Sequence, residues 1–151
     1  MSEHLTEYCV DRDLVDRGES AFACQAVLDV VLARVDTAWI DAYSDEGDLP
    51  EAAREAQDAL LRMGHARGSG DAGMGIDVDV RRGDHVRLLR AFASWSIGVE
   101  LYDDATQWVA YFSDTGASVC FNVTDEEAGM IQTSFLDVRI PVTDLKTRRK
   151  R

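Results

Sequence analysis

The chain lacks the features that mark several large classes of protein. No apolar run approaches the roughly 18 residues of a membrane-spanning helix, because charged side chains such as Asp29 and Arg34 interrupt the best candidate, 22–40. The first residues, MSEHLTEYCVDRD, have neither the basic start nor the apolar segment of a secretory signal peptide. We therefore expect a cytoplasmic protein without a membrane span.

Cysteines are few. The three present, Cys9, Cys24 and Cys120, are widely spaced and contain no C-x-x-C pair. An odd number of cysteines without regular spacing favours structural thiols in a reducing compartment over a set of disulfides or a zinc site.

Basic residues are scarce and unevenly placed. Lys and Arg number 16 against 28 Asp and Glu, which gives a net charge of -12. No Lys or Arg lies between Ala91 and Val138, whereas 146–151 is strongly basic. We expect neither a nucleic acid nor a membrane as partner, because anionic phosphates require clustered Lys and Arg. The acidity is either a general property of the organism's proteins or a surface for a cationic protein.

The length and composition predict one domain. A chain of 151 residues with 46% hydrophobic side chains can bury a core without disulfides or metal. We expect a polar N-terminal arm at 1–17, a single α+β domain at 18–145 and a basic C-terminal tail at 146–151.

The spacing of apolar residues predicts two long helices first. Apolar residues recur every three or four positions over 20–43, which predicts the first helix. The segment Asp48-Leu49-Pro50-Glu51 is typical of a helix start and predicts a second helix that ends at Gly64. These two helices predict an antiparallel helical hairpin. Residues 84–96 have a more helical than strand-like pattern, and Thr124-Asp125-Glu126-Glu127 predicts a capping box for a helix that ends near Phe135.

Alternating segments predict the strands, at 76–80, 97–102, 108–113, 117–123 and 138–142. Pro141 in the last of them favours an edge position. The predicted class is α+β, with the N-terminal helical hairpin packed on a mainly antiparallel sheet of about five strands and one or two further short helices. Strict alternation places Trp108 and Phe112 on one face and Tyr111 on the other, so we expect a helix, the arm or another chain to cover the second face.

Asp114-Thr115-Gly116 follows an apolar strand and locally resembles the catalytic triplet of aspartic proteases. In that family two such turns pair their carboxylates, so a single copy implies a homodimer. Only 35 residues follow Gly116, without the second apolar-apolar-Gly element that supports the family's active-site loop. The sequence favours an ordinary hairpin turn instead.

Two other patterns resemble functional motifs. The glycines of 68–75 have the spacing of a dinucleotide fingerprint, but a helix precedes them and a strand follows, which favours a connector. Asp77, Asp79, Asp84 and His85 include ligands suited to a divalent cation, although a solvated strand face and a helix cap explain them better. We predict no metal, no cofactor and no catalytic residue.

The leading hypothesis is a small acidic protein-binding module, of the inhibitor or immunity type or an adaptor or assembly protein, which recognises a basic surface and is able to form oligomers. The predicted contact residues combine acidic side chains with two aromatic anchors: Glu100, Asp103, Asp104, Trp108, Tyr111, Asp125, Glu126 and Glu127. The alternative is a small-ligand-binding protein or hydrolase whose site gathers separated residues, namely Asp77, Asp79, His85 and Asp114. The sequence favours the binding protein over the enzyme.

Overall fold

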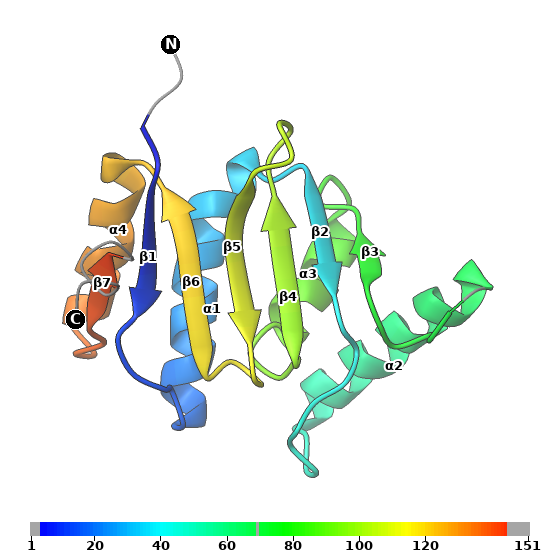
Figure 1. The fold of residues 1–151 in the computed structure, drawn as a ribbon. Helices are drawn as coiled ribbons and strands as arrows, with labels where there is room; N and C mark the ends of the chain where they lie inside the picture. Colours follow the sequence, from blue (N-terminus) through cyan, green and yellow to red (C-terminus); the bar gives the residue numbers. More distant parts are fainter. Residues whose placement is uncertain (1–3, 69, 145–151) are drawn as a thin grey trace.

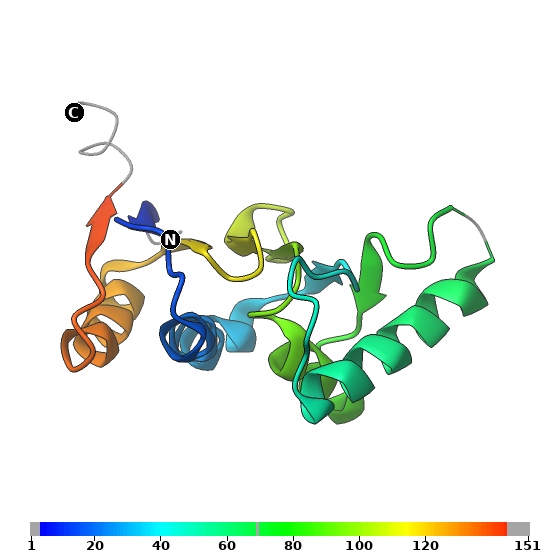
Figure 2. The same ribbon diagram turned by 90° about the horizontal axis from the view of Figure 1, so that it is seen from below.

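A single antiparallel sheet organises the chain in a computed structural model, which describes residues 4–68 and 70–144. The sheet has seven strands in the order β3-β2-β4-β5-β6-β1-β7, and each of its pairings is antiparallel. The helices lie on one side of this sheet, and no described helix covers the other face (Figures 1 and 2). The α+β class is therefore confirmed.

The elements follow one another in a mixed order along the chain. The strands are β1 (Thr6–Val10), β2 (Thr37–Ile40), β3 (Ile76–Val78), β4 (Gly98–Tyr102), β5 (Trp108–Ser113), β6 (Ser118–Val123) and β7 (Val142–Asp144). The helices are α1 (Arg17–Val31), the short 3-10 helix η1 (Leu32–Arg34), α2 (Glu51–Arg67), α3 (Gly83–Phe92) and α4 (Asp125–Leu136).

The predicted N-terminal helical hairpin is wrong. The helical pattern of 20–43 breaks after η1, and β2 pairs with β3 on one side and β4 on the other. Strand pairing overrides the helical spacing here because Ala38 and Ile40 are buried while Trp39 between them is 38% exposed, which is the period of a strand. As a result α1 packs against α4, and α2 packs against α3.

Residues near both ends of the described chain, in β1 and β7, also belong to the sheet. The predicted polar arm at 1–17 contains β1, which lies between β6 and β7 and buries Cys9 and Val10. The sheet therefore has seven strands, rather than about five. The last strand begins later than predicted, at Val142, and is at the sheet edge, as Pro141 beside it suggested. The basic tail 146–151 lies outside the described residues.

Of the two helix starts predicted from local sequence, that of α4 is confirmed and the cap predicted for α2 is wrong. The capping box of α4 is present: the Glu127 amide donates to Thr124 Oγ1 (3.2 Å), and the Thr124 amide donates to a Glu127 carboxylate oxygen (3.0 Å). For α2 the predicted Asp48 cap is absent, because the helix begins after Pro50 without a side-chain cap.

The C-terminal end of α2 lies beyond the predicted stop at Gly64. The helix continues to Arg67 and ends at Gly68, which has the positive φ (78°) that glycine tolerates. Gly64 has a packing role instead, since a Cβ there would collide with the backbone of Ala72. Among the described residues, no helix is long and apolar enough to cross a membrane.

The core lies between the helices and the covered face of the sheet. Central strands contribute Leu101, Phe112 and Phe121, which are fully buried. The helices contribute Leu28, Phe92, Ile131 and Phe135, also buried. This packing leaves the opposite side chains of the same strands without a helical cover, and the candidate site is on that side.

Candidate binding groove on the open sheet face

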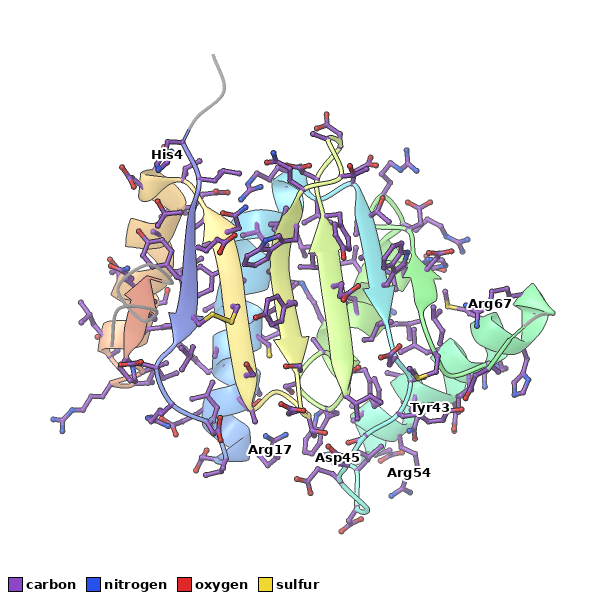
Figure 3. The ribbon with its side chains drawn as sticks, in the orientation of Figure 1. His4, Arg17, Tyr43, Asp45, Arg54 and Arg67 are labelled. Atoms are coloured by element: carbon purple, nitrogen blue, oxygen red, sulfur yellow. A yellow bond between two sulfur atoms is a disulfide. The ribbon has the colours of Figure 1, made fainter. Side chains whose placement is uncertain are left out.

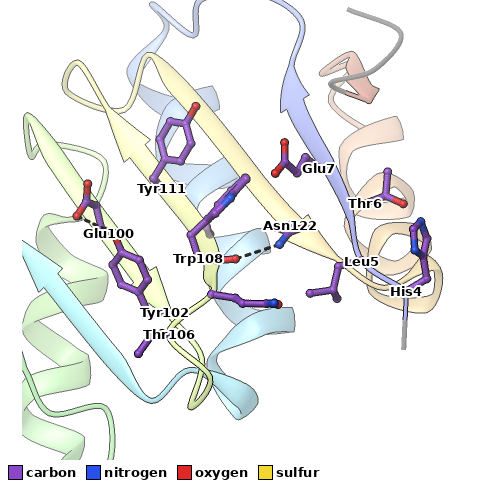
Figure 4. Close-up of a pocket in the computed structure, with 12 residues that line it drawn as sticks. His4, Leu5, Thr6, Glu7, Glu100, Tyr102, Thr106, Trp108, Tyr111 and Asn122 are labelled. Carbon is purple, nitrogen blue, oxygen red and sulfur yellow. Dashed lines mark hydrogen bonds between the residues drawn. The ribbon is translucent and has the colours of Figure 1, made fainter. Parts of the chain in front are cut away.

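A groove of about 840 Å³ crosses the open face of β1, β6, β5 and β4 (Figure 4). Its lining combines aromatic rings, carboxylates and an amide, contributed among others by Glu7, Glu100, Tyr102, Trp108, Tyr111 and Asn122. Three of the contact residues predicted from the sequence, Glu100, Trp108 and Tyr111, are therefore brought together. We call this site the open-face groove.

A β-bulge places Trp108 and Tyr111 on the same face. Tyr102 is opposite Trp108 and Leu101 is opposite Ala110, so the register shifts between these two pairs and Val109 is an extra residue. The strict alternation predicted for the hairpin is therefore wrong at Trp108. The rings of Trp108 and Tyr111 lie with their centroids 5.4 Å apart, and the indole joins the open-face groove instead of the core.

Aromatic rings continue across the neighbouring strands. Tyr102 is the cross-strand partner of Trp108, and its ring centroid lies 5.2 Å from that of Trp39 on β2. Asn122 on β6 fixes the bulge from the other side, since its side-chain amide donates to the Trp108 carbonyl (3.2 Å; Figure 4). Tyr102, Trp108 and Tyr111 form the aromatic floor of the groove, which is held in place by cross-strand contacts and by this side-chain hydrogen bond.

The charge in the open-face groove is negative. Glu7 lies on β1, opposite Asn122 of β6, and Glu100 lies on β4, opposite Tyr111 of β5. The Tyr102 hydroxyl donates to Glu100 (3.1 Å). Burial, and then the negative charge of Glu100, raise the pKa of Tyr102. Among the residues that line the groove, none is Lys or Arg, and His4 at the rim is the sole basic side chain.

The predicted contact residues Asp103 and Asp104 belong to the β4–β5 turn and are not among the residues that line the open-face groove. Thr106 and Gln107 of this turn line the open-face groove. The Asp103 carboxylate is occupied locally, because it accepts hydrogen bonds from the Ala105 (2.9 Å) and Gln107 (3.0 Å) amides. Asp104 is exposed. Asp103 therefore shapes the turn, and Asp104 adds negative charge beside the groove.

The acidic residues at the start of α4 divide in a similar way. Asp125 and Glu126 are exposed at the edge where β6 ends, whereas Glu127 is half-buried and pairs with Arg34 Nε (2.8 Å). Burial acts to raise the pKa of Glu127, but the hydrogen bonds from Arg34 and the Thr124 amide outweigh it and lower this pKa. Glu127 therefore has a structural partner, and its carboxylate is less available to another molecule than those of Asp125 and Glu126.

Asp114 is part of a hairpin turn, as the sequence favoured. The Ala117 amide donates to the Asp114 carbonyl (3.2 Å), and both residues between them, Thr115 (φ 57°) and Gly116 (φ 77°), have the positive φ of a type I′ turn. The Arg17 guanidinium donates to the Thr115 carbonyl (2.6 Å). The Asp114 carboxylate is exposed.

The other residues of the alternative hydrolase site are far from this turn. Asp77 belongs to β3, and the Asp79 amide donates to His85 Nδ1 (3.0 Å). Since β2 and β4 lie between β3 and β5, about 14 Å separates these residues from the strand that carries Asp114. Asp79 pairs with Arg81, and its pKa is lowered by hydrogen bonds from the Arg81 amide and guanidinium. Within the described ranges no group of three His, Cys, Asp or Glu side chains is arranged to hold a metal ion.

The prediction of free thiols is wrong for two of the three cysteines. Cys9 on β1 and Cys120 on β6 are direct cross-strand partners, 4.1 Å apart at Cα, and form a disulfide that is visible as a yellow bond in Figure 3. Cys24 remains free, and burial raises its pKa to about 12. The sequence could not show this pairing because it depends on β1 joining β6. A reducing, cytoplasmic location stays a prediction.

Sequence reasoning missed most of the other residues that line the open-face groove, among them Glu7, Tyr102 and Asn122. The polar composition of 1–17 predicts an arm and contains no signal for the pairing of β1 with β6, which is what places Glu7 beside Asn122. Tyr102 had a usable signal, since it alternates with Leu101 and lies two residues after Glu100 on the same predicted face.

Comparisons with known proteins add no relative to these observations. No protein-family model, no curated protein sequence and no solved structure matches this chain.

Proposed function

We propose that the chain is a protein-binding module whose open-face groove receives a basic segment of a partner protein. The observation that carries this proposal is the juxtaposition of Glu7 and Glu100 with an aromatic floor, in a groove whose described lining contains neither Lys nor Arg. Three of the residues that the sequence singled out for a cationic partner belong to this groove.

The chemistry of the lining suits guanidinium and ammonium groups. A cation over the face of Trp or Tyr is attracted by the ring quadrupole, and carboxylates beside the ring provide charge-assisted hydrogen bonds. The exposed edges of Trp108 and Tyr111 also provide apolar area that a long, methylene-rich basic side chain can cover. A sheet face with these groups selects for a peptide that is both cationic and able to lie flat.

The acidic residues around the groove support a role as an inhibitor or adaptor. Asp104, Asp125 and Glu126 are exposed near one end of the central strands. Such a field accelerates association with a basic protein and disfavours acidic or nucleic-acid partners. Two copies of this chain that met through their open-face grooves would oppose carboxylate with carboxylate, so we favour a different protein as the partner.

The test uses a defined peptide in place of the partner. The full chain is titrated with a capped peptide that contains three arginines, and with the same peptide in which citrulline replaces each arginine. We expect binding of the arginine peptide alone, and perturbation of the Trp108 indole and Tyr111 ring signals in NMR spectra. The variant Glu7→Gln/Glu100→Gln should bind about five- to tenfold more weakly, because two carboxylates at the site lose their charge.

A matched variant separates the groove from overall charge. Glu46→Gln/Glu55→Gln removes two exposed carboxylates elsewhere, near and on α2, and should leave the affinity unchanged. Equal weakening by both double variants would mean that only the net charge matters, and equal binding of the citrulline peptide would overturn the cation-specific groove.

A further inference from the structure

We infer that the chain's own basic segment, 146–151, occupies the open-face groove in the free protein and is displaced when a partner binds. This inference rests on the proposed function, because it requires that the groove accept a basic segment. The segment 146–151 then competes with the partner for the groove, and only a partner that binds more strongly than the segment displaces it.

The described part of β7 ends beside the groove wall. β7 is antiparallel to β1, and its last described residue, Asp144, is opposite Tyr8. The preceding residue of β1 is Glu7, which lines the open-face groove and is opposite Asn122. The last described residue of β7 is therefore opposite the immediate neighbour of Glu7, the groove's first carboxylate.

The length of the segment matches the width of the groove. Four strand spacings separate β7 from β4, which corresponds to about 19 Å. Six extended residues span about 20 Å, so 146–151 is long enough to reach from Glu7 past the aromatic floor to Glu100.

The charges are complementary. Five of the 16 basic residues of the chain lie in this segment, as Lys146, Arg148, Arg149, Lys150 and Arg151. The strands that form the centre of the groove, β4 to β6, belong to the stretch from Ala91 to Val138 that contains no Lys or Arg. A tethered segment has an effective concentration of about millimolar at a site within its reach, so even a weak interaction keeps the groove occupied.

The test compares two variants of the full chain that each lose two positive charges. Arg148→Gln/Arg149→Gln alters the segment, and Arg62→Gln/Arg87→Gln alters two exposed arginines on α2 and α3. We expect the arginine peptide to bind the first variant several-fold more tightly than the wild type, and up to about tenfold for an effective concentration well above the segment's own dissociation constant. The second variant should bind like the wild type.

NMR spectra of the free proteins provide a second measurement. The Trp108 and Tyr111 signals should shift in Arg148→Gln/Arg149→Gln, and the difference should not depend on protein concentration. A concentration-dependent difference would mean that the segment binds a second copy, which overturns occupancy within one chain.

The two proposals fail in different ways. If the peptide binds the wild type and both variants equally and the ring signals do not move, the groove accepts basic peptides but the segment does not occupy it. If the peptide binds none of the proteins, the proposed function is overturned. In that case unchanged ring signals overturn the internal competitor as well.

Discussion

The two faces of the sheet are made by alternate residues of the same strands, yet they are built differently. On the covered face, Phe112 and Phe121 are fully buried beneath helices. On the open face, their neighbours Tyr111 and Cys120 are cross-strand partners, with Tyr111 38% exposed and Cys120 in a disulfide. The covered face is held by packing. The open face combines one covalent link with rings and carboxylates that remain accessible.

This contrast separates residues that stabilise the protein from residues that are available for recognition. Acidic side chains follow the same division, since Glu127 is paired inside the helical layer whereas Glu100 is exposed on the open face. Three measurements would sharpen or break the contrast.

The largest expected effect concerns the covalent link on the open face. Cys9→Ala/Cys120→Ala should lower the free energy of unfolding by about 4–5 kcal/mol, because the bond closes a loop with a sequence separation of 111. Urea denaturation with and without a reductant measures it. The reductant should destabilise the wild type and leave the double variant unaffected; an equal response of the two proteins would show that the open face needs no such link.

The next effect compares adjacent residues of β5. Phe112→Ala should cost about 3–4 kcal/mol, because a fully buried ring is replaced by a cavity. Tyr111→Ala should cost about 1 kcal/mol, since it removes a half-exposed ring and its contact with Trp108. Denaturation midpoints give both values. Similar costs at the two positions would contradict the division between a packed and an accessible face.

The smallest effect concerns the two neighbouring glutamates of α4. Glu127→Gln should cost about 1–2 kcal/mol at pH 7, because it weakens the capping box and the ion pair with Arg34. The folded-state pKa of Glu127 is lowered, so its stabilising contribution is present above the unfolded value near pH 4.3 and is lost as the pH falls through the folded pKa.

The pH dependence provides the control for this variant. The difference in unfolding free energy between Glu127→Gln and the wild type should shrink when denaturation is repeated below about pH 4. Glu126→Gln, at an exposed position one residue earlier, should change stability by less than about 0.5 kcal/mol. A large cost at Glu126, or a constant difference for Glu127 across this pH range, would disprove the assigned structural role.

Much of the second half of the fold could be predicted from local patterns. The β5–β6 hairpin follows from two alternating segments around Asp114-Thr115-Gly116, and the start of α4 follows from its capping box. The first half was harder, because 20–43 has apolar residues at a helical spacing although 37–40 form a strand. Pairing with β3 and β4 stabilises 37–40 as a strand, and no local pattern in the sequence indicates this pairing.

The sequence by itself determined where the charges and rings lie along the chain: a base-free stretch with Glu100, Trp108 and Tyr111, and a basic segment at 146–151. Only the tertiary structure decided that these three residues share one groove with Glu7. The bulge at Val109 turns Trp108 to the open face, and β1 pairs with β6 across a separation of more than one hundred residues. Both depend on cross-strand register, a property of two segments together that neither segment specifies alone.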